Sequence, residues 1–149
     1  MCLDKNRLAG LVLYCLIFAS PVLAAEDLAS AISRANGSAK ATNAAAEKVI
    51  TWFQVDPSHS ESLLWFEMFT RAYPRSLNDF DTVIKIVDTS PGHVQDEHGQ
   101  RLLKYMKQQE SVNDKASEVG SIIKAYGFPS KEFRQLWIEM VRELKATKE

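Results

Sequence analysis

The most apolar stretch of the chain outside its N-terminus is the segment from Ser58 to Tyr73. On a helical wheel its apolar side chains cover more than half of the circumference, whereas Glu67, Thr70 and Arg71 share a narrow arc. A helix that is apolar over so wide an arc has to be covered on several sides, so this segment predicts the central helix of a bundle. We expect Glu67 to face solvent. The apolar arc consists of Leu64, Trp65, Phe66, Met68, Phe69, Ala72 and Tyr73.

Proline and capping residues divide the chain after this segment. Pro74 cannot continue a helix, so we expect the central helix to start at a Ser58–Glu61 capping box and to end near Tyr73. Ser76 and Asp79 match a second capping box, which predicts a third helix that reaches about as far as Val87. The sequence therefore predicts a turn around Pro74 and two helices on either side of it.

Further helices are expected beyond residues 89–92, where Thr-Ser-Pro-Gly stops the third helix. Residues 93–110 indicate a less regular helix, and Ser111 is the predicted cap of another that ends at a Gly127 C-cap. Ser130 is the predicted cap of the last helix. The inward stripe before Gly127 is predicted to be Val112, Ala116, Val119, Ile123 and Tyr126. Because no segment alternates with the period of a strand, we predict an all-α domain of five to six helices.

Residues 25–54 are rich in Ala, Ser and Asn and precede the helical core that we expect over residues 57–149. Apolar and small side chains recur there at spacings of four and three. This spacing predicts one long helix through Gly37, and the alternative is two helices with Ser38 capping the second. Alanine and threonine bury little apolar area, so the first part is expected to dock weakly. We call the repeating positions the N-terminal stripe: Leu28, Ile32, Ala35, Ala39, Thr42, Ala46, Val49 and Phe53.

The first 24 residues have the pattern of a secretory signal peptide. A basic start with Lys5 and Arg7 precedes an apolar run too short to span a bilayer, and Val22 and Ala24 supply the small residues of a cleavage site. An uncleaved anchor or a buried N-terminal helix is the alternative. We expect cleavage after Ala24, a single domain over residues 25–149, and a periplasmic or secreted product without stable membrane insertion.

Charge and cysteine content exclude several classes of function for the expected mature chain. Both cysteines, Cys2 and Cys15, lie in the signal peptide, so the mature chain has no disulfide, thiol nucleophile or thiolate metal site. Without Lys5, Arg7 and Asp4 the chain has 16 basic and 18 acidic side chains, a formal net charge of −2. This balance argues against nucleic acid as a partner, because general binding to it requires a basic face.

One short segment contains several side chains that can bind a metal ion. His93 and Glu97 are four residues apart and share one helical face, and Asp96 or His98 lies close in sequence. A zinc site needs three or four converging ligands, whereas this spacing aligns only two. We therefore expect a solvated first helical turn and no metal, with His93, Glu97 and His98 as the weak candidates.

These observations leave three functions open. The favoured hypothesis is an exported interaction protein, for example an inhibitor, immunity factor or assembly accessory factor, because no catalytic or cofactor-binding motif is present. The alternatives are a carrier of a small apolar ligand among the aromatic side chains, and a metal-dependent enzyme that uses residues 93–98. We expect no enzyme activity and no cofactor. The predicted contact with a partner protein, or with a second copy in a homodimer, uses Leu28, Ile32, Ala35 and Ala39.

Overall fold

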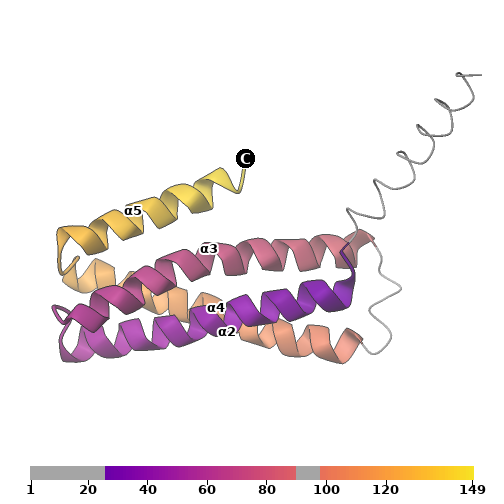
Figure 1. Ribbon diagram of the computed structural model, residues 1–149, viewed down its shortest axis with the longest axis horizontal. Helices are drawn as coiled ribbons and strands as arrows, with labels where there is room; N and C mark the ends of the chain where they lie inside the picture. Colours follow the sequence, from indigo (N-terminus) through magenta and orange to yellow (C-terminus); the bar gives the residue numbers. More distant parts are fainter. Residues whose placement is uncertain (1–25, 90–97) are drawn as a thin grey trace, which may run out of the picture.

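The computed structural model describes residues 26–89 and 98–149, and these residues contain four helices. Three long helices lie side by side, and the shorter last helix packs along one end of them (Figure 1). No strand occurs in the described residues, so the all-α prediction is confirmed for them. The helices are α2 (Leu28–Val55), α3 (Ser60–Thr89), α4 (His98–Tyr126) and α5 (Lys131–Ala146).

Helix α2 is one continuous helix, which decides between the two alternatives for residues 25–54. It begins where the Asp27 side chain accepts a hydrogen bond of 2.8 Å from the Ser30 backbone N–H, and it passes through Gly37 without a break. Its alanines make close packing possible, since a small side chain lets a neighbouring helix approach. The weak docking expected for its first part is wrong: Leu28 and Ile32 are each only 5% exposed.

Helix α3 continues through Pro74 to Thr89, so the predicted break at Tyr73 is wrong. A proline inside a helix costs about 3 kcal/mol, because it removes a backbone donor and crowds the preceding turn. Here Pro74 is buried. The apolar side chains of α3 pack against neighbouring helices both before and after the proline in sequence. Tertiary packing therefore offsets the local penalty. Ser76 and Asp79, predicted to cap a new helix, are instead buried side chains within α3.

The N-terminal cap of α3 also differs from the predicted capping box. Helix α3 begins at Ser60, two residues after the predicted cap Ser58. The Ser58 hydroxyl donates to Asp56 Oδ1 at 2.6 Å, and the Glu61 backbone N–H donates to His59 Nδ1 at 3.1 Å. His59 thus accepts the hydrogen bond that the prediction assigned to a serine.

Helix α4 is likewise longer than predicted, because it crosses the expected cap at Ser111 without interruption. The Ser111 hydroxyl lies 3.4 Å from Asn43 Oδ1 of α2, so it contacts a neighbouring helix. The predicted C-cap is confirmed: Gly127 has a φ of +77°, and its N–H donates to the Ile123 carbonyl. Tyr126, expected to point inward, is 86% exposed. Two pairs of predicted helices are each one helix in the structure, α3 and α4. This is why the described residues form four helices and not five to six.

The apolar core consists of two clusters that Tyr73 connects. The first lies at the end of the bundle where α5 packs against α3, and the second lies toward the other ends of α2, α3 and α4. Tyr73 packs against both. The first cluster contains Ala45, Ala46, Val49, Phe66, Phe69, Ala116, Val119, Ile123, Phe133 and Met140. The second contains Leu28, Ala31, Ile32, Ala35, Ala39, Val83, Tyr105 and Val112.

The predicted central helix is only partly covered. Phe66 and Phe69 are fully buried, but Leu64 is 52% exposed and Met68 is 46% exposed. Glu67 lies at the edge of this surface and forms an ion pair of 2.6 Å with Arg71, one turn further along α3. An apolar strip of α3 is therefore left without cover by the described residues. Among the described helices, none combines the length and apolar character needed to cross a membrane.

Candidate functional site

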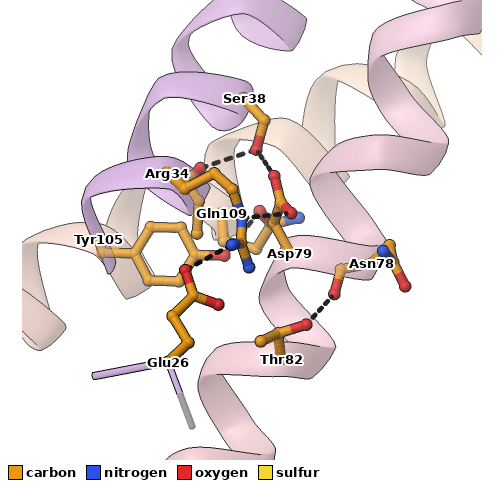
Figure 2. A network of polar contacts seen from close by, with 9 residues as sticks. Glu26, Arg34, Ser38, Asn78, Asp79, Thr82, Tyr105 and Gln109 are labelled. Carbon is orange, nitrogen blue, oxygen red and sulfur yellow. Dashed lines mark hydrogen bonds and ion pairs between the residues drawn. The ribbon is translucent and has the colours of Figure 1, made fainter. Parts of the chain in front are cut away.

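The most buried charged group in the described residues is Asp79, in the second half of α3. Its side chain is 8% exposed and receives two hydrogen bonds from α2 (Figure 2). Arg34 Nε donates to Oδ1 at 3.1 Å, and the Ser38 hydroxyl donates to Oδ2 at 2.8 Å. A buried carboxylate requires such partners, because it has lost its hydration. The contact fixes the position of α2 along α3.

Arg34 connects this buried carboxylate to the protein surface. Its guanidinium also forms an ion pair with Glu26, just before α2. The hydrogen bonds that the guanidinium donates, first to Glu26 and then to Asp79, raise the pKa of Arg34 above its ordinary value despite partial desolvation. Arg34 therefore uses its Nε atom for Asp79 and its Nη1 atom for Glu26, while its side chain stays 48% exposed.

A second set of buried polar side chains joins α3 to α4. Gln109 Oε1 accepts a hydrogen bond of 3.0 Å from the Ser76 hydroxyl and a longer one of 3.5 Å from the Tyr105 hydroxyl. Burial, together with the nearby charge of Asp79, raises the pKa of Tyr105. Tyr105 is therefore a neutral phenol at physiological pH and not a candidate base. Together with the contacts between Asp79 and α2, these hydrogen bonds hold three helices in register.

A groove of about 560 Å³ lies between α2 and α3 next to this polar network. Its lining includes Gly37 and Ala72 on its sides, and Arg34, Arg75 and Asp79. A Cβ added at Gly37 would meet no atom within 4 Å, so space is open at this point. Two of its charged residues, Arg34 and Asp79, are paired with each other.

A second groove, of about 520 Å³, lies between α3 and α5 and has a different character. Leu63 of α3 and Leu136 of α5 line it, and both also pack against the first core cluster. Three carboxylates, from Glu67, Glu132 and Glu139, also line it. The remaining lining residues are Lys131 and Gln135. Apolar side chains thus lie beside an excess of negative charge.

The exposed apolar strip of α3 borders this groove. Leu64 and Met68 are one helical turn apart, and they lie next to Leu63 and Glu67 on the neighbouring row of the same helix. The groove and the strip together form a continuous surface, because residues three and four apart are neighbours on a helix. We call it the α3–α5 surface: Leu63, Leu64, Glu67, Met68, Lys131, Glu132, Gln135, Leu136 and Glu139.

The other side of α5 carries the opposite charge. A groove of about 360 Å³ is lined there by Trp137, Ile138 and Val141 together with Arg142 and Lys145. The carboxylates Glu132 and Glu139 therefore lie on one side of α5, and the cations Arg142 and Lys145 lie on the other. The spacing of these charges can be seen in the sequence of α5. Only the packing of α5 on α3 shows which side of α5 borders α3.

The predicted metal-binding residues are only partly described. His93 and Glu97 lie outside the described residues. His98 is the first residue of α4, and its Nδ1 atom is buried without a hydrogen-bond partner in the described part of the chain. Across residues 26–89 and 98–149, no group of three or more His, Cys, Asp or Glu side chains is placed to hold a metal ion.

The predicted partner-binding residues lie inside the fold. Leu28, Ile32, Ala35 and Ala39 belong to the second core cluster, where Val83, Tyr105 and Val112 also lie. Ala35 and Ala39 are fully buried. These positions already contact α3 and α4, so a partner would reach them only after α2 had left the bundle. Exposed apolar side chains beside a groove occur instead in the α3–α5 surface and on the far side of α5, neither of which the sequence singled out.

Comparison with known proteins gives no relative from which a function can be transferred. No protein-family model, no curated protein and no solved structure matches the chain.

Proposed function

We propose that this chain is an exported helical protein that binds another protein through the α3–α5 surface. The observation that supports this most directly is the exposure of Leu64 and Met68, one turn apart, beside a groove with apolar side chains. Contiguous exposed apolar side chains bordered by polar groups are typical of protein interaction sites. Burying them against a partner removes apolar surface from water, which favours association.

Export is the second part of the proposal and rests on the sequence of residues 1–24. A basic start, a short apolar run and small residues before Ala25 are what signal peptidase substrates share. The intact mass of the protein from the exported fraction of its source is expected to match a chain that begins at Ala25 or Glu26. A membrane-bound product that retains residues 1–24 would contradict export.

The binding part is tested by capture with surface variants. We expect the wild-type protein, used as bait in the exported fraction of its source, to retain a defined protein partner. The double variant Leu64→Gln with Met68→Gln is expected to lose at least about tenfold in retained partner, since each substitution removes part of an interface core. Both positions are exposed and glutamine suits a helix, so the fold is expected to persist.

Two matched controls separate the α3–α5 surface from apolar exposure in general. Leu103 of α4 is 62% exposed and Ile138 of α5 is 40% exposed, but neither lines this groove. Leu103→Gln and Ile138→Gln are expected to retain the partner as the wild type does. If all of these variants lose it equally, or if the double variant keeps it, the interface lies elsewhere. Circular dichroism and thermal unfolding establish that each variant is folded.

A further inference from the structure

We infer that the partner of the α3–α5 surface presents a basic amphipathic helix, which extends the proposed function and rests on it. Apolar side chains of such a helix would contact Leu63 and Leu136 in the groove and the exposed Leu64 beside it. Its lysines or arginines would lie near Glu132 and Glu139. The inference depends on the charges at the groove, on their separation across α5, and on the size of the groove.

The carboxylates at the groove are incompletely compensated. Glu67 is paired with Arg71, but no cation in the described part of the chain forms an ion pair with Glu132 or Glu139. Glu139 receives only a neutral hydrogen bond of 2.8 Å from Gln135. Lys131 is the one cationic residue in the lining. A partner that carries positive charge would therefore gain attraction here, and an acidic partner would be repelled.

The arrangement of charge on α5 makes this preference directional. Glu132 and Glu139 are seven residues apart and lie on the groove side, whereas Arg142 and Lys145 line the opposite groove. A helix that displayed mixed charge on both sides would not discriminate between acidic and basic partners. The groove side carries more carboxylates than cations, since Lys131 is present there too, and the far side carries Arg142 and Lys145, so a basic partner is favoured on the groove side.

The length of the groove suits a short helical segment. From Lys131 to Glu139 the α5 side of the groove extends about 12 Å, at 1.5 Å per residue, which corresponds to roughly two helical turns. The groove lies between two packed helices, and a third helix fits between such ridges with its apolar side down.

A second copy of the chain is the competing occupant. The far side of α5, with Ile138, Val141, Arg142 and Lys145, is apolar and basic, so it has the required chemistry. A contact between two different surfaces of one protein does not close on itself unless the rotation happens to form a ring, and it otherwise grows without limit. We therefore assign the groove to a different protein.

The test uses two synthetic 14-residue amphipathic peptides with the same leucine face. One carries lysines on its polar face and the other carries glutamates. Fluorescence anisotropy of labelled peptide, titrated with the full mature protein, measures the dissociation constants. The lysine peptide is expected to bind at least about tenfold more tightly than the glutamate peptide, since several charges at the rim of the groove act together.

A charge-reversed variant and a matched control locate the binding site. The double variant Glu132→Lys with Glu139→Lys is expected to reverse the preference toward the glutamate peptide. The control Glu110→Lys with Glu118→Lys changes the net charge equally, at exposed positions of α4, and is expected to keep the wild-type preference. If the two double variants behave alike, binding follows net charge and the inference is overturned. Equal affinity of the two peptides for the wild type also overturns it.

The remaining outcomes distinguish this inference from the proposed function. Concentration-dependent self-association in sedimentation that Leu64→Gln with Met68→Gln abolishes would make a second copy the occupant and overturn the inference. If capture of the natural partner requires Leu64 and Met68 but is unaffected by Glu132→Lys with Glu139→Lys, the proposed function stands and the basic helix is excluded. If capture requires neither pair, both fail.

Discussion

Asp79 is a charged side chain in the interior of a helical bundle, and its partners come from a different helix. Removing it deprives Arg34 and Ser38 of a charged acceptor. Because hydrogen bonds to charged groups contribute more than neutral ones, Asp79→Ala is expected to lower the free energy of unfolding by about 1.5–3 kcal/mol. Urea denaturation monitored by circular dichroism measures the change.

The neighbouring Asp81 provides the control for this substitution. Its side chain is 65% exposed and lies 4.0 Å from Lys85, a surface pair. Asp81→Ala is expected to change the free energy of unfolding by less than about 1 kcal/mol. A similar loss at both positions would indicate a general effect of negative charge on the bundle, and not a specific role of Asp79.

Tyr105 is expected to make the stability of the protein decrease at alkaline pH. Its pKa is raised in the folded state, so its contribution to stability is complete below the ordinary phenol pKa of about 10 and is lost as pH rises above it. We expect the free energy of unfolding to fall above about pH 10, and to fall less steeply in Tyr105→Phe. Tyr126, which is 86% exposed, is the matched control, and Tyr126→Phe is expected to leave the pH profile unchanged.

At the scale of single helices, Gly37 and Gly127 are expected to respond oppositely to the same substitution. Gly37 lies in the interior of α2 with open space around it, so Gly37→Ala is expected to stabilise the protein by about 0.5–1 kcal/mol. Gly127 has a φ of +77°, which an L-residue rarely adopts, so Gly127→Ala is expected to destabilise it by about 1 kcal/mol. Thermal unfolding midpoints that moved in the same direction would contradict this assignment.

The sequence predicts the helices themselves better than their boundaries. Apolar spacing identified all four helical regions, and Gly127 was identified as a C-cap. By contrast, Pro74, Ser76 and Ser111 carry strong local signals for helix ends, yet packing against neighbouring helices overrides each of them. Local rules describe an isolated segment, whereas the hydrogen-bond partner of the buried Ser76 is Gln109, which lies 33 positions further along the chain.

The candidate site could be predicted only in part for a related reason. The charges of Glu132 and Glu139 are visible in the sequence, and so is their seven-residue spacing. Which side of α5 adjoins α3 is a property of packing, and it decides whether those charges border a groove or face open solvent. The prediction that the N-terminal stripe contacts a partner failed for a different reason. Small side chains indicate that another helix approaches closely, but they do not show whether that helix belongs to the same chain.

For the molecule as a whole, α2 is an integral part of the bundle and not a detachable leader. Deleting residues 25–39 would remove five members of the second core cluster and both α2 partners of Asp79. The truncated protein is therefore expected to lose cooperative unfolding, in contrast to the weak docking that its alanine-rich composition suggests. Circular dichroism during heating is the measurement, and a truncated chain with a sharp transition would show that the second cluster is dispensable.

Pro74 has a consequence for how this molecule opens. Proline has no amide hydrogen to donate, so the hydrogen-bond ladder of α3 is interrupted near Tyr73. Among the side chains that the structure describes, Tyr73 alone packs against both clusters. The bundle is then expected to behave as two cooperative units joined at a hinge, the one beneath α5 being the more resistant to local unfolding. Native-state hydrogen exchange would show two groups of amides with distinct opening free energies. A single value along all of α3 would mean that the Tyr73 ring couples the two units completely.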